Sequence, residues 1–105
     1  MVKVVWTKKS HISFDYTFNM CAEDYGMKSA NKLYDLVFKK IDRLIKFPLS
    51  CSIEPLLYGE PENYRSCIIR KPLKMVYHYV EESDTLYIDN FWDMRRNPDA
   101  LKGDI

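Results

Sequence analysis

The chain has 105 residues, of which 47% are hydrophobic and 14% aromatic, and its 16 basic and 15 acidic residues leave a formal net charge of +1. This composition excludes a disordered chain and allows one hydrophobic core, so we expect residues 1–105 to form one domain. No apolar run approaches the roughly 18–20 residues of a membrane span, and the first residues lack the pattern of a signal peptide. The near-neutral charge argues against non-specific coating of nucleic acid. We therefore expect a cytoplasmic globular protein that does not enter membranes.

The first 26 residues predict a strand followed by a helix. Residues 3–6 are a short Val-rich run, which favours a strand. Ser10 or Ser13 could then cap a helix, and Gly26 suits its C-terminal end. The apolar positions of this helix follow helical spacing: Phe14, Phe18, Cys21, Ala22 and Tyr25.

A second helix is the clearest element of the sequence. Its apolar residues recur at three- and four-residue steps, which places them on one face: Ala30, Leu33, Tyr34, Val37, Phe38, Ile41, Leu44 and Ile45. Ser29 could open this helix, and Pro48 marks its end. Because only residues 26–28 separate the two helices, we expect an antiparallel helix hairpin.

The second half of the chain predicts a loop followed by three strands. Residues 49–63 contain Pro55, Gly59 and Pro61 and indicate a loop, which we expect to lie over one end of the sheet. Residues 64–70, 73–80 and 86–92 are rich in β-branched and aromatic side chains. The dipeptide Lys71-Pro72 indicates a turn between the first two, and the polar residues 81–84 join the last two. The predicted fold is α+β, with the helix hairpin packed on one face of a mainly antiparallel sheet.

The three cysteines give no sign of a disulfide framework. Cys21, Cys51 and Cys67 are an odd number, and their spacing matches no metal-binding pattern. We expect three buried thiols rather than a disulfide or a zinc site.

The basic residues of the predicted strands could form an anion-binding site. Strand alternation puts Lys74 and His78 on one face of residues 73–80. A suitable register would bring Arg65 beside them, and Arg95 and Arg96 follow the last strand. Such a group suits a phosphodiester, because cations stabilise charge on phosphate oxygens and histidine transfers protons near neutral pH.

Structural roles for the same residues stay open at this stage. His78 could be packed among aromatic neighbours, Arg65 and Lys74 could be solvated or paired with Glu81, Glu82 or Asp89, and Arg95-Arg96 could pair with Asp93 or Asp99. The sequence has no phosphate-binding glycine loop, no nucleophile elbow and no metal-ligand spacing, so we expect no cofactor and no metal.

The order of elements, with the segments YRSCIIRKPLKMVYHY and LYIDNFWDMRRNP, resembles the RelE/ParE family of toxins over residues 2–101. The resemblance implies a cytosolic toxin of a type II toxin–antitoxin system, of the kind linked to plasmid stabilization. Its implied partner is a cognate antitoxin that orders on binding, within a homodimer or a heterotetramer of toxin and antitoxin.

The resemblance implies two activities. RelE-like members are metal-independent mRNA interferases, endoribonucleases that cleave messenger RNA on the ribosome, whereas ParE-like members inhibit DNA gyrase without nuclease activity. An inactive, antitoxin-binding relative is a third alternative. Arg65 and Lys74 fall where RelE-like chains carry basic residues, and Arg95 or Arg96 meets the C-terminal basic position. Cys67 stands where those nucleases can carry lysine, and no tyrosine follows Arg96. From the sequence we favour RNA cleavage by Arg65, Lys74, His78, Arg95 and Arg96.

Overall fold

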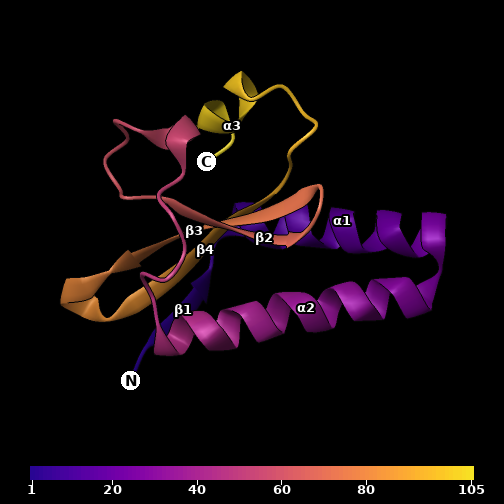
Figure 1. Cartoon of the computed structure of the whole chain (residues 1–105), viewed down its shortest axis with the longest axis horizontal. Helices are drawn as coiled ribbons and strands as arrows, with labels where there is room; N and C mark the ends of the chain where they lie inside the picture. Colours follow the sequence, from indigo (N-terminus) through magenta and orange to yellow (C-terminus); the bar gives the residue numbers. More distant parts are fainter.

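A twisted four-stranded sheet lies at the centre of the computed structural model, which describes all 105 residues (Figure 1). The strands are β1 (Lys3–Trp6), β2 (Arg65–Arg70), β3 (Leu73–Val80) and β4 (Thr85–Asp93). The helices are α1 (Lys8–Tyr25), α2 (Met27–Lys46) and the short α3 (Asp99–Gly103), with single 3₁₀ turns η1 (Pro55–Leu57) and η2 (Glu81–Ser83). The α+β class and the order of the main elements are confirmed. Helix α3 was not predicted.

The sheet has the order β1-β4-β3-β2. Strands β2, β3 and β4 form the predicted antiparallel meander, while β1 pairs in parallel with β4. The β3–β4 pairing shifts by one residue between Val76 and Tyr77, because Asn90 opposes Val76 and Ile88 opposes Tyr77. Asp89 is therefore the extra residue of a β-bulge, a feature that re-aims side chains locally.

The helix boundaries correct two predicted caps. Helix α1 is capped by Thr7 rather than by Ser10 or Ser13, because the Thr7 side chain accepts a hydrogen bond from the Ser10 backbone N–H at 3.2 Å. Helix α2 begins before Ser29, directly after Gly26, which is the only residue between the two helices. Gly26 has φ 92° and ψ 166°, a conformation essentially restricted to glycine, and this allows so short a connection.

The main core lies between the helix hairpin and one face of the sheet. The buried face of α2 carries Ala30, Leu33, Val37, Ile41 and Leu44, as its periodicity predicted. It packs with side chains of one face of β2–β4, among them Cys67, Met75, Tyr77, Ile88 and Phe91. Tyr25, predicted on the apolar face of α1, is 77% exposed because it lies at the hairpin end, which projects beyond the sheet (Figure 1).

The opposite face of the sheet is partly covered by the loop between α2 and β2 and by the C-terminal segment. A second, smaller apolar cluster forms there from Leu57 of η1, Val76 of β3, Trp92 of β4 and Leu101 of α3. Asn90 donates hydrogen bonds to the backbone and side-chain oxygens of Asp104, which fixes the C-terminal segment against this face. The loop thus lies on the sheet, as expected, and adds a partial third layer.

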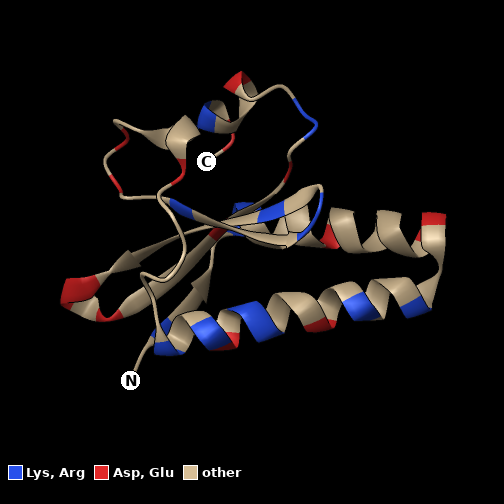
Figure 2. Ribbon diagram, in the orientation of Figure 1, with Lys and Arg blue, Asp and Glu red and all other residues tan.

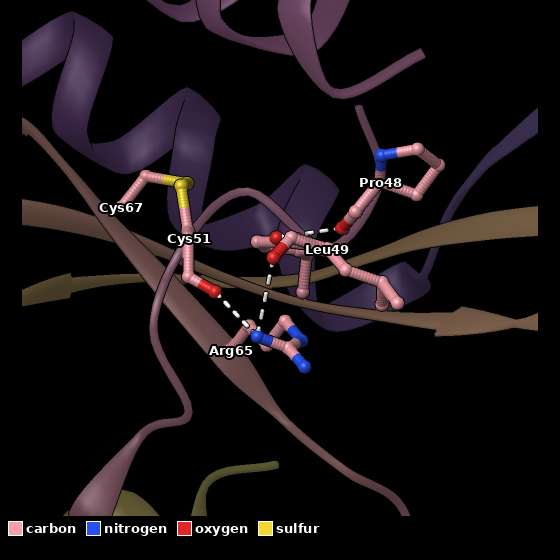
Figure 3. Close-up of a disulfide and its surroundings, with 6 residues drawn as sticks. Pro48, Leu49, Cys51, Arg65 and Cys67 are labelled. Carbon is pink, nitrogen blue, oxygen red and sulfur yellow. Dashed lines mark hydrogen bonds between the residues drawn. A yellow bond between two sulfur atoms is a disulfide. The ribbon is translucent and has the colours of Figure 1, made fainter. Parts of the chain in front are cut away.

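The prediction of three free thiols is wrong for two of them. Cys51 and Cys67 form a disulfide with their Cα atoms 5.7 Å apart, whereas Cys21 is free and buried (Figure 3). Cys67 lies on β2, and Cys51 lies in the segment that crosses this strand after α2. Their separation of 16 residues matches no sequence pattern, and only the fold brings them together.

Candidate functional site

Arg65 does not join Lys74 and His78, contrary to the register assumed from the sequence. It pairs with Tyr77 across β2 and β3, so its side chain lies on the face that carries Tyr77, opposite to that of Lys74 and His78. The guanidinium donates to the backbone oxygens of Cys51 at 2.6 Å and Leu49 at 3.3 Å (Figure 3). These bonds give Arg65 a structural role, since they hold the segment that follows α2.

Lys74 lies on the face opposite the helices, but its charge is already paired. Its ammonium group binds the carboxylate of Glu54. The side chains of Lys74 and Glu54 are 11% and 2% exposed. Glu54 also accepts a hydrogen bond from the Leu56 N–H, which caps η1. Lys74 is thus neutralised by a buried partner that the sequence did not single out.

His78 is held in a fixed orientation by its neighbours. Its Nδ1 lies 2.6 Å from the Oδ2 of Asp89, the bulged residue of β4. The ring stacks on Tyr87 with 4.8 Å between centroids and forms a T-shaped pair with Tyr64 with 5.3 Å between centroids. Its Nε2 faces Glu62, with 4.0 Å between Nε2 and Oε2.

The carboxyl group of Asp89 has an altered proton affinity. Burial raises the pKa of Asp89, while the hydrogen bond and charge of His78 act in the opposite direction. An acidic residue that orients an imidazole in this way can support proton transfer at the other ring nitrogen. The arrangement is the one feature of the predicted site that could carry acid–base chemistry.

Arg95 and Arg96 lie apart from this pair and have partners of their own. Arg95 forms an ion pair with Asp93 at 2.6 Å, one of the alternatives left open by the sequence, and this pair lowers the pKa of Asp93. Arg96 lies over the ring of Trp92, 4.2 Å from its centroid, and 3.8 Å from an oxygen of Asp104. The five predicted residues therefore do not gather around one point. Their catalytic roles remain predictions.

An open groove along α1 has a volume of about 1240 Å³. Ile12, Tyr16 and Met20 line it at four-residue steps, and Ile12 and Tyr16 are 59% and 68% exposed. The β2–β3 turn and the C-terminal segment form the other walls. Small-molecule pockets rarely exceed about 1,000 Å³, so the shape suits a peptide segment better. Their four-residue spacing is a signal of this exposed stripe that can be seen in the sequence itself.

Helix α2 is rich in basic residues (Figure 2). This helix holds six of the 16 basic residues and two of the 15 acidic ones, so it carries a net charge of +4 and the rest of the chain −3. None of the six cations forms an ion pair. Helical geometry places five of them in a stripe opposite the buried face; we call this the α2 stripe, made of Lys28, Lys32, Lys39, Arg43 and Lys46.

Neither a metal-binding cluster nor a membrane-spanning helix is found. No three His, Cys, Asp or Glu side chains come together in a way that could hold a metal ion. No helix combines the length and apolar character needed to cross a bilayer.

The fold is similar to that of two solved structures, one from a toxin–antitoxin system and one of a toxin. One is a chain of the chromosomal ParDE toxin–antitoxin system of P. aeruginosa, with a TM-score of 0.70 and 14% identity over 90% of this chain and 98% of that chain. Another is a metal-bound toxin from Helicobacter pylori, with a TM-score of 0.62 and 20% identity over 89% of this chain and 94% of that chain. No protein-family model and no curated protein matches the sequence. The similarity confirms the fold that the RelE/ParE resemblance implied.

Proposed function

We propose that this chain is the toxin of a type II toxin–antitoxin pair and that it acts by binding its target, not by cleaving RNA. The observation that carries this choice is the dispersal of the cations. Arg65 lies on the helix side of the sheet, Lys74 is paired with a buried carboxylate, and Arg95 is paired with Asp93. Metal-independent cleavage of a phosphodiester is favoured by cations that are directed together at one phosphate. DNA gyrase is the target that the ParE side of the resemblance implies.

The groove along α1 supports the antitoxin as a partner. Its exposed apolar stripe, Ile12, Tyr16 and Met20, is bordered by charged residues of both signs. A disordered segment with apolar anchors at matching intervals would bury this stripe when it orders on the toxin. We expect the double variant Ile12→Asp/Tyr16→Asp to remain toxic but to escape neutralisation by the antitoxin. Full neutralisation of this variant would contradict the assignment.

The α2 stripe supports docking on an acidic target. Its cations are unpaired, and they remain available when a segment occupies the groove along α1, because only Ser29 and Leu33 of α2 line that groove. Complementary charge on a partner accelerates association and fixes orientation. We expect Lys39→Glu/Arg43→Glu to abolish toxicity. The matched control is Lys3→Glu/Lys102→Glu, which makes the same charge change at two other exposed, unpaired lysines.

The deciding experiment is induced expression in a bacterial host, with plasmid supercoiling and new RNA 5′ ends followed together. The proposal expects growth arrest with altered supercoiling and intact messages. New 5′ ends within translated messages would overturn the binding mechanism. Unimpeded growth with neither change would mean an inactive relative.

A specific observation favours RNA cleavage as the second candidate. Asp89 orients His78 through Nδ1, and Lys74 lies on the same face of β3. In this candidate His78 would transfer the proton and Lys74 would hold phosphate once freed from Glu54. New 5′ ends that disappear in His78→Ala, and persist in the exposed control Tyr58→Ala, would support it.

A further inference from the structure

We propose that Cys51 and Cys67 are a reversible thiol–disulfide site, and that its redox state controls how firmly the loop of residues 52–64 covers the sheet. The site would be reduced by a dithiol of the thioredoxin class. The redox state would act on this loop and on the sheet face beneath it, whichever target the toxin attacks.

The loop covers the two predicted functional groups on the face opposite the helices. Glu54 pairs with Lys74, and Glu62 faces the Nε2 of His78 at 4.0 Å. Tyr64 at the end of the loop forms a T-shaped contact with the ring of His78. Both groups are thus covered by carboxylates of the same segment, in the places that the anionic groups of a ligand would take. Figure 2 shows this segment as an acidic part of the molecule.

The disulfide closes the base of this loop. It links Cys51, just before the loop, to Cys67 on β2, just after it. Two backbone hydrogen bonds span the same base, from Glu54 N–H to Tyr64 O at 2.8 Å and from Ser66 N–H to Ser52 O at 3.1 Å. Towards the tip, Leu57 is the loop's buried apolar anchor. In the reduced chain the loop would be kept closed by non-covalent contacts alone: these contacts, the Lys74–Glu54 pair, the packing of Tyr64 on His78 and the hydrogen bonds from Arg65 to Cys51 O and Leu49 O.

The two cysteine residues differ in exposure, and this difference suggests the order of the reaction. Cys51 is partly exposed, whereas Cys67 is 3% exposed. A thiolate of the reductant would attack Cys51 Sγ, form a mixed disulfide there and release Cys67 as a thiolate. The second thiol of the reductant then attacks the reductant sulfur that is bound to Cys51 in the mixed disulfide. This step closes the disulfide of the reductant and releases Cys51 as a thiolate. Two electrons pass to the protein, the reductant becomes a disulfide, and the two released thiolates take up two protons.

The sequence predicts a cytoplasmic protein, and in that compartment a disulfide between Cys51 and Cys67 would point to regulation. In a reducing cytoplasm, disulfides are usually transient or regulatory rather than permanent. Conditions that oxidise thiols would then close the loop over Lys74 and His78. Reducing conditions would let it open and expose both groups to anionic ligands.

Hydrogen exchange and amine labelling of the full chain test the proposal. The oxidised protein is compared with protein reduced by dithiothreitol. A disulfide across 16 residues restricts the open loop strongly, so we expect amide exchange in residues 52–64 to become on the order of tenfold to a hundredfold faster on reduction. Labelling of Lys74 by an amine-reactive ester should accelerate in parallel, while labelling of Lys39 on the α2 stripe should not change.

Variants separate a local from a global effect. Cys51→Ser should reproduce the reduced protein without reductant, and Cys21→Ser, which removes the free thiol, should behave like the oxidised wild type. Unchanged exchange in residues 52–64 would overturn the proposal, as would equally accelerated exchange in residues 30–44 of α2. A disulfide that thioredoxin cannot reduce would overturn its reversibility. None of these readouts depends on toxicity, so failure here and failure of the proposed function are distinguishable.

Discussion

Replacing Lys74 with Met should be among the most destabilising single substitutions in the sheet. Lys74→Met keeps the length of the side chain but removes the ammonium group that pairs with Glu54. The carboxylate of Glu54, 2% exposed, would keep only the hydrogen bond from the Leu56 N–H. Removing one partner of a buried ion pair costs about 3–5 kcal/mol, because an uncompensated charge remains. A domain of this kind has about 5–15 kcal/mol of stability in total.

The double variant Glu54→Gln/Lys74→Met is the matched control. The introduced amide would be neutral and its oxygen would still accept the hydrogen bond from the Leu56 N–H, so most of the stability should return. Urea unfolding of the wild type, both single variants and the double variant gives the coupling energy of the pair. Each kcal/mol lost should lower the melting temperature by about 4 °C or more.

A loss below about 1 kcal/mol in Lys74→Met would refute this reasoning, since that is the range of solvated surface pairs. The result also affects functional tests. A Lys74 variant that fails to poison cells could simply be unfolded. Toxicity should therefore be compared between Lys74→Met and the double variant, which both lack the amine but differ in stability.

Three further substitutions test the local structure. Gly26→Ala should cost about 1–3 kcal/mol in urea unfolding, because φ 92° and ψ 166° suit only glycine; an unchanged midpoint would mean a rearranged hairpin. Thr7→Ala should cost about 1 kcal/mol through loss of the α1 cap, whereas Thr7→Ser should cost much less. Burial raises the pKa of Asp89 above its ordinary 3.8, against the effect of His78, so the folded chain holds this proton more tightly. Stability should then fall as the pH rises from 3.8 through the raised pKa, and Asp89→Asn should flatten that part of the pH profile.

The elements were predictable because their signals are local. The three- and four-residue spacing of the apolar residues in α2 fits one face of a helix. The aromatic and β-branched runs of β2, β3 and β4 are separated by a proline turn and by a polar cluster. The caps were less clear, since serine also occurs inside helices. Ser10 and Ser13 both lie within α1 and donate backwards, to Thr7 O and Ser10 O.

The candidate site was less predictable because it depends on register and long-range contact. A shift of one residue between strands moves a side chain to the other face, and this is what separates Arg65 from Lys74. The bulge that brings Asp89 to His78 leaves no sequence pattern. The partners of Lys74 and Cys67 come from the loop after α2, whose path over the sheet cannot be read from its composition.

The distribution of charge shows why net charge alone is a poor guide to partners here. A total of +1 argues against indiscriminate binding of nucleic acid, because that binding grows with the number of phosphates neutralised. Yet the same total combines a basic helix of net charge +4 with a remainder of −3. In physiological salt the interaction between exposed charges falls off over about 8 Å, so a partner close to α2 experiences the α2 stripe and little of the acidic loop on the other side of the sheet. Topology, by placing these two regions on opposite layers, gives a nearly neutral chain one strongly charged surface for recognition.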